Sequence, residues 1–291
     1  MHRFLLHNDE IRDAGDRLVS PGQVGLVNGW GVFSTIRVED GVMFAWERHW
    51  ARMQRDAARL RVPFPSDAKW LEERLYRLID ANHASHSTLR VIVVRNRGGM
   101  WEGPAAAERE FDTVAFTAPL NSWGDSVKLG VIPQARHAAS EFSGTKYLSW
   151  SENLTRYERA HEQGFDEVVL LNERGEVAEC TSANIFAVQG ENVFTPPLAS
   201  GCLPGVTRAL LLEEIRVPGV TVSERILLPS DLETADEVFI TSTTRDLMPV
   251  ASVDGLKIKQ GRRVRNRLQQ AFTAYTQAYV RSRVRETEKV H

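Results

Sequence analysis

Lys146 and Glu179 are the two residues whose types and surroundings most suggest covalent chemistry. Only six of the 36 basic residues are lysines, at positions 69, 128, 146, 257, 259 and 289, and the others are arginines. A partly buried lysine, unlike an arginine, can lose its proton at modest cost, and the neutral amine then attacks carbonyl carbons. Lys146 follows the turn Ser143-Gly144-Thr145 and opens the apolar and aromatic run 147–150. These surroundings favour a lysine that forms a Schiff base.

Glu179 lies 33 residues further on (179 − 146), at the end of a stretch typical of a β-strand. A carboxylate there can hold a proton on a heterocyclic nitrogen. A lysine Schiff base together with a carboxylate facing a pyridine nitrogen is what pyridoxal phosphate needs from a protein. Taken alone, each residue has an ordinary alternative, because a lone lysine or a glutamate at a strand end is commonly a solvated surface charge.

The sequence around these two residues resembles the fold-type IV family of pyridoxal-phosphate aminotransferases. That family includes branched-chain aminotransferases, D-amino-acid transaminases and aminodeoxychorismate lyases. The similarity extends from Gly22 to about Gly255, and several blocks follow one another in the order and spacing of the family. The matching blocks are Lys146–Leu154, Gly164-Phe-Asp-Glu-Val-Val-Leu-Leu171 and Glu179-Cys-Thr-Ser-Ala-Asn-Ile-Phe186.

A phosphate-binding motif is indicated at Leu203–Arg208. This string places a glycine turn before a helix, with Pro204 at its tolerated first position, and the first N–H groups of a helix favour a dianion. Arg52 matches the phosphate arginine of the family, although it could instead be a surface residue of an amphipathic helix. The hydroxyl-rich turn 241–244 matches another phosphate contact, although it could equally cap a helix. The resemblance implies Lys146 as the catalytic residue and Lys146, Glu179, Arg52, Leu203, Val206, Thr207 and Thr243 as cofactor-binding residues.

The resemblance also implies residues that bind substrate. In the family, a hairpin equivalent to 31–37 lines the substrate pocket, and an arginine equivalent to Arg90 binds the carboxylate of the second substrate in branched-chain enzymes. Arg90 has the alternative of being a buried structural arginine. The implied substrate-binding residues are Phe33, Arg90, Asn28, Trp30 and Thr244, the last through its backbone.

The sequence indicates the family more clearly than it indicates which enzyme of that family this chain is. Branched-chain enzymes have tyrosines where this chain has Asn28 and Ser151, and many relatives have an acid at Ser34. The loop after Arg95 lacks, at Met100 and Glu102, the Arg-x-His of the D-amino-acid transaminases. We therefore expect an aminotransferase that moves the amino group of an L-amino acid, branched-chain or related, to a 2-oxo acid such as 2-oxoglutarate. The alternatives are an aminodeoxychorismate lyase, a D-amino-acid transaminase and a pyridoxal-phosphate-binding protein without catalytic activity.

Composition and charge argue against several other classes of protein. A net charge of −2 gives no electrostatic reason to expect nucleic acid or an anionic membrane as a partner. The two cysteines, Cys180 and Cys202, are too few for a disulfide framework and lack the spacing of a metal site, which favours a reducing cytoplasm. No apolar stretch is long enough for a secretion signal or a membrane span.

The order of the expected elements favours a two-domain α/β (α+β) protein. Apolar spacing predicts helices over 46–60 and 67–78, strands over 31–38, 88–94, 113–116 and 127–132, and a helix from about 149 to 162. A strand near 184–188, a helix after Pro204, a strand near 237–240 and a helix over about 261–285 complete the expected elements. The resemblance implies a small N-terminal α/β domain over residues 1–118, a linker over 119–125, and a larger cofactor-binding domain over 126–291, with a pseudo-barrel sheet flanked by helices. It also implies a homodimer.

Overall fold

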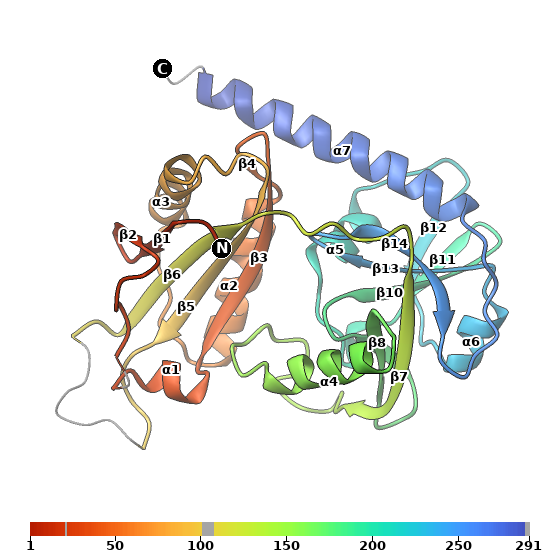
Figure 1. Cartoon of the computed structure of the whole chain (residues 1–291). Coiled ribbons are helices and arrows are strands. Elements are labelled where there is room, and N and C mark those ends of the chain that lie inside the picture. The colour runs from red at the N-terminus through yellow and green to blue at the C-terminus, as the bar shows by residue number, and fades with distance from the viewer. Residues whose placement is uncertain (21, 101–107, 289–291) are drawn as a thin grey trace. The chain divides into compact units, whose positions relative to one another are not determined.

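The computed structural model describes residues 1–20, 22–100 and 108–288 (Figure 1). The chain divides into two compact units, which we describe separately. Unit 1 contains Met1–Asn121, Lys146–Trp150 and the chain from Tyr279 onward, and unit 2 contains Ser122–Thr145 and Ser151–Ala278. The domain boundaries at 118 and 126 stay a prediction, because compact units defined by contacts need not coincide with domains.

Unit 1 is built on a six-stranded antiparallel sheet in the order β2-β1-β6-β5-β3-β4. The long neighbours β3 and β5 pair along their whole length, so that Phe33 lies opposite Ile92 and Thr35 opposite Arg90. The strands are β1 (Phe4–His7), β2 (Glu10–Asp13), β3 (Gly31–Glu39), β4 (Val42–Met43), β5 (Ser87–Arg95) and β6 (Phe111–Ala118).

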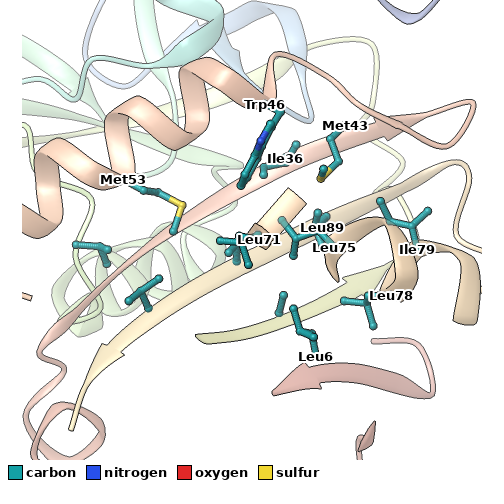
Figure 2. Close-up of a cluster of buried hydrophobic side chains, with 14 of the residues drawn as sticks. Leu6, Ile36, Met43, Trp46, Met53, Leu71, Leu75, Leu78, Ile79 and Leu89 are labelled. Carbon is teal, nitrogen blue, oxygen red and sulfur yellow. The ribbon is translucent and has the colours of Figure 1, made fainter. Parts of the chain in front are cut away.

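Two amphipathic helices, α2 (Trp46–Arg59) and α3 (Ala68–Ala81), supply the core of unit 1 together with this sheet. Figure 2 shows Met53 and Trp46 of α2 and Leu71, Leu75 and Leu78 of α3 among the buried side chains of the strands. The carboxylate of Asp67 caps α3 by accepting the N–H groups of Lys69 and Trp70. The remaining helix of the N-terminal part, α1 (Val24–Asn28), is a short one.

The segment Lys146–Trp150 belongs to unit 1 because it pairs with β3. The N–H of Phe33 donates to the carbonyl of Lys146, and the N–H of Leu148 donates to the carbonyl of Gly31. A side chain at Gly31 would meet the Val93 carbonyl at 2.5 Å and Leu148 at 2.6 Å, so only glycine allows this close approach.

Unit 2 contains an eight-stranded mixed sheet in the order β12-β11-β10-β13-β14-β7-β8-β9. Strand β8 is buried along its whole length, and helix α4 packs against it through Ala160, which joins a small apolar cluster with Val168 and Leu170. The strands are β7 (Val127–Arg136), β8 (Glu167–Asn172), β9 (Val177–Cys180), β10 (Asn184–Gln189), β11 (Asn192–Thr195), β12 (Thr221–Glu224), β13 (Glu237–Ser242) and β14 (Asp246–Val253). The helices are α4 (Ser151–Glu162), the 3-10 turn η1 (Leu198–Ser200), α5 (Val206–Glu213), α6 (Pro229–Thr234) and α7 (Arg263–Glu288), the last of which continues into unit 1.

The helices and strands expected from apolar spacing are confirmed, with ends displaced by a few residues. The helix expected from about 149 begins at Ser151, because the preceding residues pair with β3 instead. Periodicity did not predict β1, β2, β11 or β12, which are only four residues long, nor β14, nor the short helices α1 and α6. Among the described residues, no helix combines the length and apolar character that crossing a membrane requires.

A buried carboxylate closes the hairpin between β8 and β9. Glu176 accepts hydrogen bonds from Asn172 at 2.8 Å and Ser200 at 2.9 Å, and from Arg174 through both Nε and Nη2. These donors, with that of Arg174 as the largest effect, lower the pKa of Glu176 to about 2. The hairpin leads directly into Glu179.

We predict that Glu176→Gln removes part of the acid dependence of stability. Because the pKa of Glu176 is lower in the folded than in the unfolded chain, its stabilisation is present above about pH 4.5 and is lost as the pH falls toward 2. Urea unfolding followed by circular dichroism should show a loss of about 1–3 kcal/mol at pH 7 in the variant. The difference from the wild type should shrink between pH 4.5 and 2, and a difference independent of pH would contradict this account.

Candidate active site

In unit 1, the backbone of Lys146 is fixed by two elements. Its N–H donates to Asp56 Oδ2 over 3.0 Å, and its carbonyl accepts the N–H of Phe33 over 3.2 Å. Asp56 is buried on α2, and its other oxygen, Oδ1, accepts the side chain of Arg55. The buried carboxylate therefore connects the lysine segment to α2 while β3 holds it on the other side.

The amine of Lys146 lies over aromatic surface. Its Nζ is 4.5 Å from the ring centroid of Phe33 and 5.4 Å from that of Trp150, and the two rings meet edge to face. Arg90 also contacts Phe33, with its guanidinium carbon 4.1 Å from the ring centroid. Phe33 thus brings two cationic side chains to one ring. Burial lowers the pKa of Arg90 below its usual value.

Arg52 lies on α2 in the same unit and is buried. Its Nη2 donates to Ser34 Oγ over 2.7 Å. Burial, partly offset by the charge of nearby Asp56, lowers the pKa of Arg52 to about 10, so the guanidinium stays charged at neutral pH. Its Nε is buried without a hydrogen-bond partner among the described residues. A buried cation with an unused N–H group suits an anion that binds there.

Asn28 and Trp30 use their polar groups elsewhere in unit 1. The amide of Asn28 donates to the carbonyl of Val24, and the indole N–H of Trp30 donates to the carbonyl of Leu60. Arg95 lies over the Trp30 ring at 4.3 Å. Their expected contact with substrate stays a prediction.

In unit 2, both oxygens of Glu179 are engaged. Arg136 Nε donates to Oε1 over 3.0 Å, and the N–H of Leu203 donates to Oε2 over 2.9 Å. Arg136 donates in addition to Asn153 on α4 over 3.1 Å. Each carboxylate oxygen has two lone pairs, so Glu179 keeps acceptor capacity for a further N–H group.

Asn184 links Glu179 to the start of α5. Its amide donates to the carbonyl of Leu203 over 2.9 Å, the residue whose N–H binds Glu179. A Cβ on Gly205 would lie 2.1 Å from Asn184 Oδ1, so a larger residue here would displace the Asn184 side chain. The N–H groups of Val206 and Thr207, both buried, lie in the first turn, where an α-helix provides no acceptor.

Thr243 and Thr244 form the turn between β13 and β14. The next residue, Arg245, is buried, and its Nη1 donates to Ser182 Oγ over 2.7 Å and pairs with Glu167 over 3.3 Å. Glu167 also accepts the N–H of Thr181. The hydroxyl-rich turn is therefore tied to the loop that follows Glu179.

Sequence reasoning missed Arg136, Arg245 and Glu167 as supporting residues. Arg136 stands at the end of β7, 43 positions before Glu179, and nothing local in the sequence connects the two. Glu167 and Arg245 lie within sequence blocks that match the family, and this position could have indicated that they support the site.

Each unit by itself carries groups that suit pyridoxal phosphate. Unit 1 has an amine and a buried guanidinium with an unused N–H group, and unit 2 has a carboxylate that is hydrogen-bonded to the segment leading into α5. The hydroxyl oxygen of Thr241 is also buried without a hydrogen-bond partner among the described residues. These are the donors and acceptors that a ring nitrogen and a phosphate require.

Comparison with known proteins supports the same family. The model of a family described as amino-transferase class IV matches residues 31–253. The branched-chain-amino-acid aminotransferase of Escherichia coli (strain K12) is 30% identical over 291 residues, which cover 92% of this chain and 91% of that protein. A solved structure of the branched-chain amino acid aminotransferase from Escherichia coli matches with a TM-score of 0.85, at 27% identity and 95% coverage of each chain. The expected mixed α/β architecture of fold type IV, with a curled sheet flanked by helices, is thereby confirmed.

Two further similar proteins are named for other activities. The D-alanine aminotransferase of Bacillus licheniformis is 27% identical over 261 residues, 88% of this chain and 90% of that protein. A 4-amino-4-deoxychorismate lyase from Pseudomonas aeruginosa matches in structure with a TM-score of 0.76 at 24% identity, and covers 91% of this chain and 97% of its own. The last similarity shows the fold alone.

Proposed function

This chain belongs to the class IV aminotransferases, and from that premise we propose that it moves the amino group of an L-amino acid with a branched apolar side chain to a 2-oxo acid such as 2-oxoglutarate. Class IV aminotransferases use pyridoxal 5'-phosphate. When bound, this cofactor supplies an aldehyde that bonds to amines and a ring that withdraws electrons from the adjacent carbon.

We assign the proton transfer to Lys146. With the cofactor bound, Lys146 Nζ would take the proton from the α-carbon of the amino donor, and in the second half-reaction it would deliver a proton to the α-carbon of the new amino acid. The rings of Phe33 and Trp150 hold Nζ beside aromatic surface and so fix where the amine lies.

The carboxylate of Glu179 keeps a proton on the ring nitrogen in this proposal. Arg136 and the N–H of Leu203 hold this carboxylate in place, which fits an acceptor for the ring N–H. We assign phosphate binding to Arg52, Val206, Thr207 and Thr243.

The observation that carries the choice of acceptor is the position of Arg90. Its guanidinium lies on the ring over which the Lys146 amine also lies, and it has no ion pair or hydrogen bond with the residues that the structure describes. A partly buried cation without an acid is suited to a second carboxylate of a substrate. This favours a dicarboxylic 2-oxo acid such as 2-oxoglutarate.

Support for an apolar donor comes from the aromatic surface of Phe33 and Trp150 and from the 30% identity to a branched-chain-amino-acid aminotransferase. The D-alanine aminotransferase relative keeps a D-amino-acid donor as the second candidate. Against it, Met100 stands where those transaminases have arginine, and Glu102, at the position of their histidine, lies outside the described residues.

We further propose a cytoplasmic homodimer. Cys180 and Cys202 are free and buried, and burial raises the pKa of Cys202 to about 12 and that of Cys180 well above its usual value. Thiols in this state are unreactive and suit a reducing compartment.

A half-reaction screen tests the proposed donor. The purified holoenzyme is mixed with each amino acid in both enantiomers, and the visible absorbance of the bound cofactor is followed in a stopped-flow instrument. We expect the fastest changes with L-leucine, L-isoleucine and L-valine. Fastest change with D-alanine would contradict the proposal, as would pyruvate release from aminodeoxychorismate without any 2-oxo acid.

We predict that Arg90→Gln impairs the use of 2-oxoglutarate selectively. Loss of a hydrogen-bonded charge pair of about 1.5–3 kcal/mol corresponds to a KM for 2-oxoglutarate about 10- to 100-fold higher. The KM for 4-methyl-2-oxopentanoate, which lacks the second carboxylate, should change by less than about threefold. Arg90→Lys, which keeps the charge, is the matched control. An equal rise for both oxo acids would refute the role of Arg90.

A further inference from the structure

Two hydrogen bonds connect Ser34, His49 and Arg52 inside unit 1. Ser34 projects from β3, and His49 and Arg52 lie three residues apart on α2, so that both side chains reach one hydroxyl. Arg52 Nη2 donates to Ser34 Oγ over 2.7 Å, and the same oxygen lies 2.7 Å from His49 Nδ1. Both Ser34 and His49 are fully buried.

The chemistry of these groups fixes their hydrogen atoms. Arginine only donates, so Ser34 Oγ accepts from Arg52, and within the described part of the chain the hydroxyl hydrogen has only His49 Nδ1 as an acceptor. Nδ1 therefore carries no proton, and the imidazole proton is on Nε2. Burial, together with the positive charges of Arg52 and Lys146, holds the pKa of His49 well below its usual value, so the ring stays neutral.

This arrangement leaves two N–H groups unused. His49 Nε2 and Arg52 Nε are both buried, and neither makes a hydrogen bond to any residue that the structure describes. The oxygens of nearby Asp56 accept hydrogen bonds from the Arg55 side chain and from the N–H of Lys146 instead. Buried donors without acceptors are costly, so the two groups indicate an acceptor that arrives on binding.

We propose that His49 is a second side-chain donor to the cofactor phosphate beside Arg52, and that Ser34 is the positioning residue that directs the imidazole N–H toward it. The inference rests on the proposed role of Arg52. Phosphate is favoured over a neutral acceptor because Arg52 makes no ion pair with a residue that the structure describes, and because a phosphate offers several oxygens to adjacent donors.

The test compares two ligands on the full-length protein after removal of its cofactor. Pyridoxal 5'-phosphate and pyridoxal, which lacks the phosphate, are titrated while tryptophan fluorescence is followed. In His49→Leu, the dissociation constant for the phosphate form should rise about 10- to 100-fold, while that for pyridoxal changes less than about threefold. His49→Gln is the matched control, since its amide keeps an N–H group, and most of the preference for the phosphate form should remain. An equal loss for both ligands, or no loss for either, overturns the proposal.

Arg52→Gln in the same titration distinguishes a failure of the proposed role of Arg52 from a failure of the role of His49. If this variant keeps the full preference for the phosphate form, the proposed role of Arg52 fails. If Arg52→Gln loses the preference and His49→Leu keeps it, only the role of His49 fails.

A spectroscopic readout tests Ser34 without relying on ligand affinity. Nitrogen-15 NMR of holoenzyme labelled at histidine, assigned by the signal missing from His49→Gln, should show His49 protonated on Nε2 with Nδ1 accepting a hydrogen bond. Ser34→Thr should preserve this pattern, and Ser34→Ala should shift the signal of Nδ1 as its hydrogen-bond donor is lost. Protonation of wild-type His49 on Nδ1 would overturn the assignment.

Discussion

The position of Lys146 depends on hydrogen bonds that its backbone makes to a neighbouring strand and to one buried carboxylate. β3 accepts the segment 146–150 along its edge, which is possible only because Gly31 carries no side chain. Asp56 binds the Lys146 N–H from α2. Since the backbone holds the segment, the amine lies over the rings of Phe33 and Trp150 in a defined position.

In unit 2, two buried carboxylates are likewise held in fixed positions by their hydrogen-bond partners. Glu179 is held by Arg136 and the Leu203 N–H, and Glu167 is held by Arg245 and Thr181. Each carboxylate thus has a cation and a backbone donor, which offsets the cost of its burial. These pairs connect the strand that carries Glu179, the start of α5 and the turn at Thr243.

The sequence predicted the parts that rest on local pattern. Apolar spacing located α2 and α3, and the turn at Pro204 and Gly205 indicated the start of α5, because these signals lie within a few neighbouring residues. The pairing of Lys146–Trp150 with β3 was not predictable in this way. It depends on residues more than 100 positions apart and on the small size of Gly31. For the same reason Arg136 escaped notice, and the unused N–H groups of His49 and Arg52 became visible only when burial and hydrogen bonds were known.

The most direct measurement is the identity of the lysine that carries the cofactor. The holoenzyme is treated with borohydride, which makes the bond between protein and cofactor permanent, then digested and analysed by mass spectrometry. We predict a phosphopyridoxyl group on Lys146 in close to one copy per chain. A label on Lys69, Lys128, Lys257, Lys259 or Lys289, with Lys146 unmodified, would contradict the account.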